Sequence, residues 1–261
     1  MSRGAGRGDG LVNVAKEPRA LEGKVALVTG AGRRVGRAIA LALGSDGARV
    51  AVHFHGSADG ARETVSAIEA TGGEASSVQV DLGEPDAPGT LVDEVMRTFG
   101  RLDILVNSAA SMTRTPIESV TPDQWDDVFA LNLRAPFFLS LAAARAMGAP
   151  GGAIVNISDH MGFESWPGFV PHGISKAAVA SMTHALAAAL APLVRVNAVA
   201  PGAVLAPEGW PVAEEKRYDA ATPLRRVGTP EDVARAVLYL VGADYVTGEI
   251  LFVDGGRHGA R

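Results

Sequence analysis

The sequence predicts an α/β protein with one doubly wound, seven-stranded parallel sheet and helices on both of its faces. Seven short runs are apolar throughout rather than alternating, as expected for parallel strands that are buried on both faces. Segments with helical spacing separate these runs, and such alternation of strand and helix is typical of this fold class. The expected strands cover residues 24–29, 49–54, 76–80, 102–107, 152–157, 194–199 and 249–254.

The predicted helices lie between these strands. Apolar residues recur at helical spacing after the first strand, for example at Val35, Ile39 and Leu43. Two longer helices, 121–148 and 171–190, have Ala-rich faces that suit close packing between subunits. Helix starts are marked by a capping residue or a first-turn proline at Ser57, at Thr121 with Pro122, and at Thr229 with Pro230.

One compositional regime runs from residue 21 to the end, so we expect a single domain over 21–261. Residues 1–20 are rich in Gly and Arg without a period, and we expect them to form a flexible tail. The stretch 200–228 carries several Pro and Gly residues and has the length of a substrate-binding loop.

Composition narrows the function classes. Of the 261 residues, 47% are hydrophobic and 20% are charged, which indicates a globular chain rather than a disordered one. The net charge of −5 argues against a general nucleic-acid or anionic-membrane binder, and the lack of cysteine excludes thiolate chemistry. We therefore expect a cytoplasmic protein with a small-molecule partner, no nucleic acid, no membrane and no metal site.

A strand, a glycine-rich turn and a helix follow one another at 24–40. Gly30 allows a tight turn, and Gly36 lets the helix pack closely on the sheet. The helix N-terminus can then hold a pyrophosphate with its free N–H groups. This order predicts a dinucleotide site in a Rossmann-type fold, with an ordinary Gly-rich βα turn as the alternative.

The end of the second strand bears on the choice between NAD and NADP. A carboxylate there would bind the ribose hydroxyls of NAD, yet none occurs before Asp59. His53, His55 and Ser57 stand there instead, with Arg33 from the first turn. These donors favour NADP(H), although two merely exposed polar histidines would give the same pattern.

The order of the motifs resembles the short-chain dehydrogenase/reductase superfamily from about residue 21 onward. The motifs are T-G-x-x-x-x-x-G, the end of the fourth strand, Asn132 in LNLRAPFF, IVNIS, Lys176, NAVAPG and VDGG. The resemblance implies hydride transfer with NAD(P)H, a lysine that holds the nicotinamide ribose, and a homotetramer. The cofactor-binding residues that we expect are Gly30, Arg33, Arg34, Val35, Gly36, His53, His55, Ser57, Asp81, Leu82, Asn107, Ser108, Ala109, Lys176, Pro201 and Gly202.

Three of these residues have specific expected roles. Arg34 can reach the cofactor phosphates or a substrate, or be a solvated arginine on the turn. Asp81 can accept from the adenine amino group, or cap a helix. Asn107 is expected to brace the backbone around the cofactor.

Within the superfamily the chain is similar to the pteridine reductases and bacterial dihydromonapterin reductases. Asp159 stands at the position of the family's catalytic Ser, thirteen residues before His172, and Arg34 stands at that of its second glycine. Two departures are Met112, where a stacking Phe is usual, and Gly56, where an Arg is usual.

His172 occupies the place of the family's catalytic Tyr. The charge of Lys176 disfavours an imidazolium, whereas a nearby Asp159 favours it and orients the ring. We hypothesise an Asp159–His172–Lys176 relay with Asn132 holding a water behind Lys176. The alternatives are that His172 is a lost Tyr in a protein without fast chemistry, or that Asp159 is the acid.

The predicted function is NADP-dependent reduction of a C=N or C=O bond in a small substrate, with a pteridine as one candidate. The alternatives are a 3-oxoacyl or carbonyl reductase and a catalytically weak NADP-binding protein. His160 and His184 are expected to be bystanders. The residues expected to bind substrate are Arg34, Met112, Asp159, His172 and Trp210, and Met161, Phe163, Trp166 and Phe169 line the mouth of the pocket or pack beneath its loop.

Overall fold

The computed structural model describes residues 19–204 and 222–259. Nearly all of the expected tail 1–20, Trp210 and most of the 200–228 loop lie outside these described residues. The described chain forms one sheet in the order β3-β2-β1-β4-β5-β6-β7, with each neighbouring pair parallel, which confirms the predicted fold class. The strands are β1 (Val25–Val28), β2 (Arg49–Phe54), β3 (Ala75–Gln79), β4 (Ile104–Asn107), β5 (Gly152–Ile157), β6 (Val194–Pro201) and β7 (Ile250–Val253).

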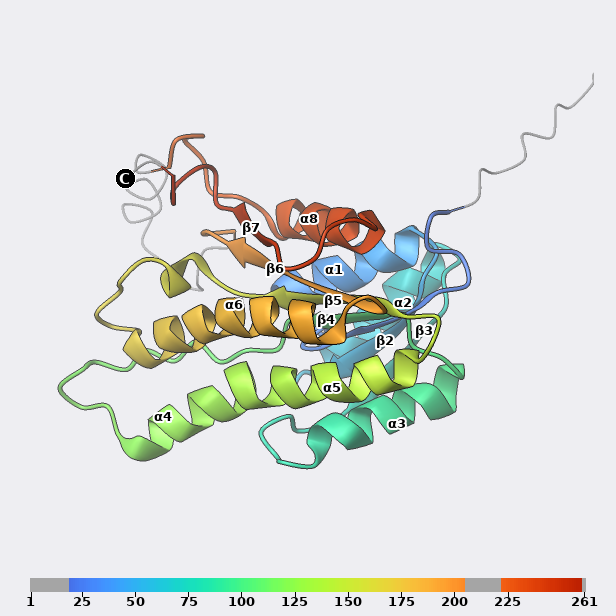
Figure 1. Cartoon of the computed structure of the whole chain (residues 1–261), viewed down its shortest axis with the longest axis horizontal. Coiled ribbons are helices and arrows are strands. Elements are labelled where there is room, and N and C mark those ends of the chain that lie inside the picture. The colour runs from blue at the N-terminus through green and yellow to red at the C-terminus, as the bar shows by residue number, and fades with distance from the viewer. Residues whose placement is uncertain (1–18, 205–221, 260–261) are drawn as a thin grey trace, which may run out of the picture.

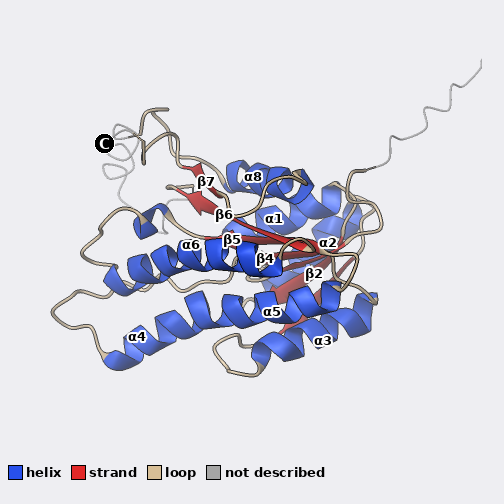
Figure 2. Ribbon diagram, in the orientation of Figure 1, coloured by secondary structure: helices blue, strands red, loops and turns tan. Residues whose placement is uncertain are grey.

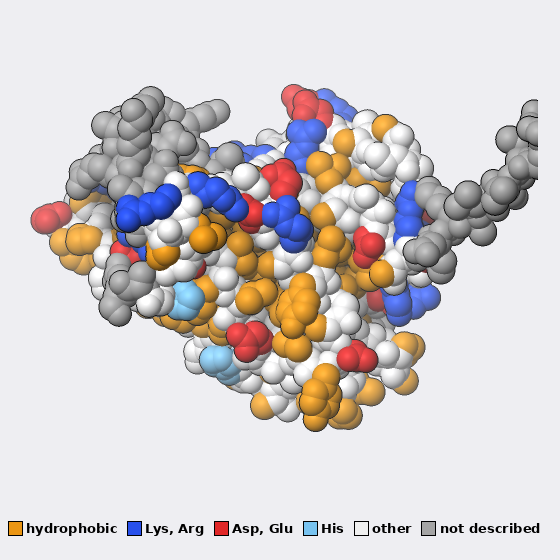
Figure 3. Space-filling view, turned by 90° about the horizontal axis from the view of Figure 1, so that it is seen from above, with side chains coloured by type: hydrophobic (Ala, Val, Ile, Leu, Met, Phe, Trp, Pro, Cys, Tyr) orange, Lys and Arg blue, Asp and Glu red, His pale blue; other side chains and the backbone are white. Residues whose placement is uncertain are grey.

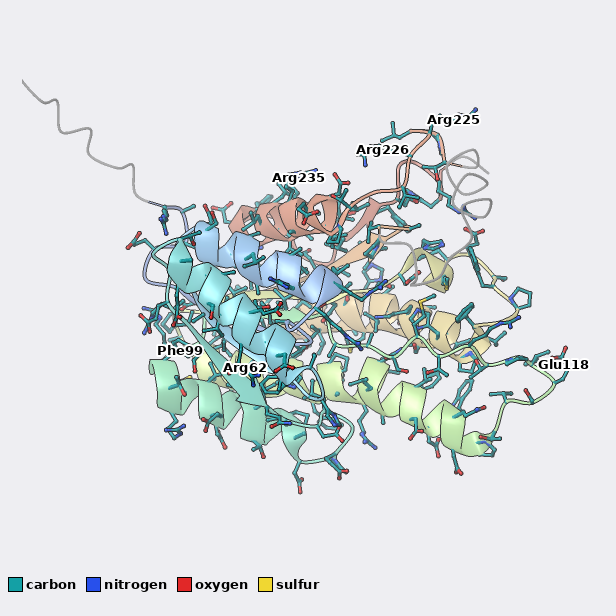
Figure 4. All side chains as sticks on the ribbon, turned by 180° about the vertical axis from the view of Figure 1, so that it is seen from behind. Arg62, Phe99, Glu118, Arg225, Arg226 and Arg235 are labelled. Carbon is teal, nitrogen blue, oxygen red and sulfur yellow. The ribbon has the colours of Figure 1, made fainter. Side chains whose placement is uncertain are left out.

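Helices cover both faces of the sheet, so that each face has its own apolar core. Figures 1 and 2 show α1, α2 and α8 on one side and α3, α5 and α6 on the other. Seen from behind, α1, α2 and α8 lie above α3 and α5 in the picture, and Arg235 projects outward from α8 (Figure 4). The helices are α1 (Arg34–Ser45), α2 (Ala58–Ala70), α3 (Ala87–Phe99), α4 (Pro122–Phe129), the π-helix η1 (Ala130–Arg134), α5 (Ala135–Met147), the short 3₁₀ helix η2 (His160–Gly162), α6 (Val170–Leu190) and α8 (Pro230–Gly242).

Two of the predicted helix starts are confirmed by reciprocal side-chain caps. Thr121 caps α4 together with Gln124, and Thr229 caps α8 together with Asp232. At the third start Ser57 precedes α2, but its side chain makes no cap hydrogen bond. The Ser57 hydroxyl therefore does not cap α2.

The single helix expected over 121–148 is interrupted by the π-turn η1. A π-turn inserts an extra residue, so it changes which side chains face inward, and such turns are common at functional sites. Here it directs Asn132 into the protein interior. Apolar spacing could not reveal this interruption because both flanking segments are ordinary helices.

The carboxyl ends of β1, β4, β5 and β6 lie at one edge of the sheet. Strands are added outward from β1 to β3, and the chain then crosses to β4 on the other side of β1. The direction of strand addition thus reverses between β1 and β4, and parallel sheets bind ligands outside that point. On the face seen from above, acidic and basic side chains are interspersed among apolar ones (Figure 3). A ligand site is therefore expected at the carboxyl ends of these strands.

Candidate active site

The glycine-rich turn after β1 has the geometry that a dinucleotide needs. Gly30 has φ of +66°, a left-handed conformation that favours glycine, and a Cβ on Gly36 would lie only 2.3 Å from the carbonyl oxygen of Gly30. The helix α1 that follows has no side-chain cap at its N-terminal residue, Arg33. An uncapped helix start beside a tight turn fits the pyrophosphate of NAD(P).

Arg34 also has a left-handed backbone, with φ of +52°. This conformation costs a non-glycine residue about 1–2 kcal/mol, and glycine would adopt it readily. Arg33 and Arg34 are both exposed beside the turn.

His53 is placed differently from our expectation. Its ring is 2% exposed, Nδ1 accepts the Gly30 N–H at 3.2 Å, and Nε2 lies 3.0 Å from the Val80 carbonyl oxygen, to which it donates. Burial lowers the pKa of His53 to about 4, so the ring is neutral. With both nitrogens used, His53 has no donor left for a phosphate, and the prediction that it binds the cofactor is wrong; it braces the glycine turn.

Three of the other predicted residues at this end, Arg33, His55 and Asp81, are exposed. His55 Nδ1 lies 3.1 Å from Asp81 Oδ1, which also accepts the Gly83 N–H at 2.9 Å. Leu82 beside them is buried. His55 and Asp81 thus lie together where β2 and β3 end.

Asn107 supports the sheet rather than the cofactor loop. It is buried, and its amide donates to Asn156 Oδ1 at 2.8 Å on the neighbouring strand. Thr29 braces the loop instead, because its Oγ1 accepts the N–H groups of Ser108 and Ala109, each at 2.9 Å. Thr29 is part of the T-G motif, but the motif alone does not predict this bracing role.

Asp159 and His172 are brought together by the turn after β5 and the first turn of α6. His172 Nε2 lies 3.5 Å from Asp159 Oδ2, and Nδ1 lies 2.9 Å from the carbonyl oxygen of Ser111. A carbonyl only accepts, so Nδ1 carries a hydrogen. In a neutral ring the Nε2 lone pair would then face a carboxylate, which is repulsive. A hydrogen on Nε2 would instead face Asp159 Oδ2 across 3.5 Å.

The charge state of Asp159 is set by its burial and its contacts. Burial alone would raise the pKa of Asp159, but contacts from His160 and His172 and the Met161 N–H outweigh it and hold that pKa well below its usual range. Asp159 is therefore an anion. His160, for which we expect no role, nevertheless contacts this carboxylate, with Nδ1 3.1 Å from Asp159 Oδ1.

Lys176 is buried one turn further along α6. Its Nζ donates to the Ile157 carbonyl oxygen at 2.8 Å. Burial lowers the pKa of Lys176 to about 8, although the negative charge of Asp159 acts in the opposite direction. The neighbouring Ser158 is structural, because its hydroxyl donates to the Lys176 carbonyl oxygen at 2.9 Å.

Asn132 contacts His172 and its surroundings rather than Lys176. Its amide donates to the Ser111 carbonyl oxygen and to Ser175 Oγ, each at 3.0 Å, and its Oδ1 accepts the Ser111 N–H at 2.8 Å. The water that we expect it to hold behind Lys176 stays a prediction. Asn132 fixes the Ser111 carbonyl that in turn fixes His172.

The expected mouth residues gather around one groove. A cavity of about 540 Å³ lies between the β5–α6 loop and α6, and Met161, Phe163, Trp166 and Phe169 all line it. Met112 is 48% exposed on the loop after β4. Among the described residues, no group of three or more His, Asp or Glu side chains is arranged to hold a metal ion.

Comparison with known proteins identifies relatives of the whole described fold. Residues 30–258 match the family described as enoyl-(acyl carrier protein) reductase. A versicolorin reductase of Emericella nidulans is 38% identical, covering 90% of this chain and 96% of that protein. The angucycline C-6 ketoreductase LanV, solved with bound NADP, has a TM-score of 0.87 at 35% identity and covers 92% of this chain and 97% of that one. A Burkholderia cenocepacia short-chain dehydrogenase, solved with NADP, has a TM-score of 0.86 at 36% identity, covering 91% and 98%.

Proposed function

The chain belongs to the short-chain dehydrogenase/reductase superfamily, as its motif order predicted, and from this premise we propose that it reduces a C=O bond of a small cyclic substrate with NADPH. The observation that carries the proposal is the close pair of Asp159 and His172, whose Oδ2 and Nε2 atoms lie 3.5 Å apart. It stands beside Lys176 at the edge of the sheet where the cofactor turn also lies.

The chain's own residues would supply the proton of the reduction. When bound, the nicotinamide supplies the hydride that reduces the carbonyl carbon. The Asp159 side chain is 22% exposed and that of His172 only 2%, so the proton leaves through Asp159. It passes from His172 Nε2 to Asp159 Oδ2 and then to the substrate oxygen, which completes the alcohol. A proton from solvent then restores the pair.

Two supports hold this pair in place. Ser111 fixes the Nδ1 side of His172, and Asn132 fixes Ser111. Lys176 stays protonated below about pH 8, so at neutral pH its ammonium can bind the nicotinamide ribose. Its positive charge also helps to keep Asp159 an anion between turnovers.

NADP(H) is the proposed cofactor. His55 and Arg33 are exposed at the end of β2 and at the first turn, where a 2′-phosphate would lie, and the hydroxyl of Ser57 makes no cap hydrogen bond. The neighbouring solved structures LanV and the Burkholderia enzyme contain NADP. Loss of His53 from the expected set leaves the phosphate to Arg33, His55 and Ser57.

Two substrate classes follow from different observations. The aromatic groove of Phe163, Trp166 and Phe169 suits a flat polycyclic ketone, and the similar proteins include a versicolorin reductase and an angucycline ketoreductase. A C=N bond of a reduced pterin is the second candidate, favoured by Asp159 in place of the family's Ser. A 3-oxoacyl substrate or a catalytically weak NADP-binding role are the remaining alternatives.

An NADPH oxidation assay separates these possibilities. The purified chain is tested with polycyclic ketones, a 3-oxoacyl thioester and dihydropterins, beside Asp159→Asn and the exposed-site control His184→Ala. We expect turnover on the ketones, a loss of about 10²-fold or more in Asp159→Asn, and none in the control. NADPH binding without turnover on any compound, with turnover gained in His172→Tyr, would contradict the proposal.

We also propose a homotetramer in the cytoplasm. The span Pro122–Met147 is long and apolar enough to cross a membrane, a test that core helices of soluble proteins also pass. One side packs on the core, and the other leaves Phe137 and Phe138 exposed beside an apolar groove of about 680 Å³ shared with α6. A second copy of this surface is its expected cover. Light scattering that gives a monomer would contradict this assembly.

A further inference from the structure

The second histidine beside Asp159 has no part in the proton path described above. His160 is the first residue of η2 and is buried. Its Nδ1 lies 3.1 Å from Asp159 Oδ1 and 3.2 Å from the carbonyl oxygen of Pro201 at the end of β6. Both neighbours accept hydrogen bonds, because one is a carboxylate oxygen and the other a carbonyl. Nδ1 of His160 therefore carries a hydrogen that it shares between them.

We infer that His160 is a positioning residue for the proposed reduction, tying the carboxylate of Asp159 to the end of β6 so that Oδ2 faces His172. This inference rests on the proposed function and adds a residue that the motif order does not assign.

The two oxygens of Asp159 have separate partners. Oδ1 receives the Met161 N–H at 2.8 Å as well as the contact from His160. With two donors on Oδ1, rotation of the carboxylate would break both contacts. Oδ2 is thereby held toward His172 Nε2 and the open side of the site. The position of Oδ2, which delivers the proton, therefore depends on the groups that hold Oδ1.

Packing keeps the His160 ring in this orientation. Trp166 meets it edge to face, with ring centroids 5.7 Å apart and an interplanar angle of 85°. Arg257, from the turn after β7, lies over the opposite part of the arrangement, 5.9 Å from the centre of the Trp166 ring. A phenyl ring at position 160 could keep this packing but would lose the hydrogen.

The titratable groups around Asp159 determine how its pKa should change when His160 is replaced. His160 faces it from η2, and His172 and Lys176 face it from α6. Among the contacts that lower the pKa of Asp159 against the effect of burial, the one from His160 is the largest. Without that donor, Asp159 holds a proton more tightly and releases it to the substrate less readily.

A matched pair of variants tests the inference. His160→Phe keeps a ring against Trp166 and removes the donor, whereas His160→Asn can place an amide N–H where Nδ1 lies. We expect kcat to fall about 10-fold to 100-fold in His160→Phe, with the KM for NADPH unchanged and most of the rate restored in His160→Asn. Equal kcat losses in both variants, or a loss accompanied by a lower melting temperature in both, would overturn a positioning role.

A second readout does not depend on turnover. Carboxyl carbon NMR of the cofactor-free protein follows the titration of Asp159, whose midpoint should rise in His160→Phe and return toward the wild-type value in His160→Asn. An unchanged midpoint would overturn the inference even where the wild-type enzyme is active. A shifted midpoint in a protein without turnover on any substrate would instead leave His160 in place and remove the proposed function.

Discussion

Replacing Lys176 by methionine should stabilise the cofactor-free protein at neutral pH. The side chain is buried, and its pKa falls from 10.5 to about 8. At about 1.4 kcal/mol for each pH unit, this fall corresponds to roughly 3 kcal/mol by which a protonated Lys176 destabilises the fold. Methionine fills a similar volume without a charge.

The lost hydrogen bond reduces this gain. Lys176 Nζ donates to the Ile157 carbonyl oxygen, and losing a bond to a buried acceptor costs about 1 kcal/mol. We therefore expect Lys176→Met to unfold with a free energy about 2 kcal/mol higher than that of the wild type at pH 7, while NADPH-dependent turnover is lost.

The pH dependence has a definite sign. Below about pH 8 the lysine is protonated in both the folded and the unfolded protein, so the destabilisation is complete. Between about pH 8 and 10.5 the folded protein binds fewer protons than the unfolded one. The free energy of unfolding of the wild type therefore rises relative to that of Lys176→Met as the pH increases.

Urea unfolding of both proteins at pH 7 and pH 10, in the absence of cofactor, measures this difference. The advantage of Lys176→Met should shrink or reverse at pH 10. A variant that is less stable than the wild type at pH 7, or a difference that is the same at both pH values, would refute the reasoning.

Two further predictions concern the same site. The low pKa of Asp159 contributes stability that is present above about pH 4 and lost below it, so wild-type stability should fall toward that of Asp159→Asn as urea unfolding is repeated at more acid pH; a constant difference would contradict this. Arg34→Gly should relieve the left-handed backbone, raising the free energy of unfolding of the cofactor-free protein by about 1 kcal/mol, while NADPH binding measured by fluorescence titration weakens; tighter NADPH binding would show that the guanidinium has no role there.

The fold could be predicted closely because its signals are local. Continuous apolar runs identified every strand within two residues or so, and Thr121 and Thr229 mark helix starts by a cap that needs only neighbouring residues. The π-turn at Ala130–Arg134 was not predicted, since its effect is to rotate side chains between two ordinary helical segments.

The site was predicted in part, for a different reason. Residue types at motif positions located Asp159, His172 and Lys176, which the structure places together. The supports were missed because they act through backbone groups: Thr29 braces two N–H groups, and Ser111 offers a carbonyl oxygen. Sequence patterns do not show where such carbonyls point.

The sequence did not predict the contacts of two histidines. We expected His53 to bind the cofactor and His160 to have no role. A histidine at a strand end gives the same sequence pattern whether its ring faces solvent or the neighbouring turn. The His53 ring faces the turn. His160 does not occupy a motif position. The 3₁₀ turn after Asp159 nevertheless brings the His160 ring back to the Asp159 carboxylate. Both outcomes depend on a tertiary contact rather than on spacing.

The source of the proton is the central claim, and a single turnover measures it directly. Protein preloaded with NADPH is mixed with an accepted ketone, and the rate of NADPH oxidation is compared between the wild type and His172→Ala at neutral pH. Loss of a positioned proton donor should slow this step by about 10²-fold to 10⁴-fold without changing NADPH affinity. A His172→Ala rate equal to that of the wild type would contradict the account.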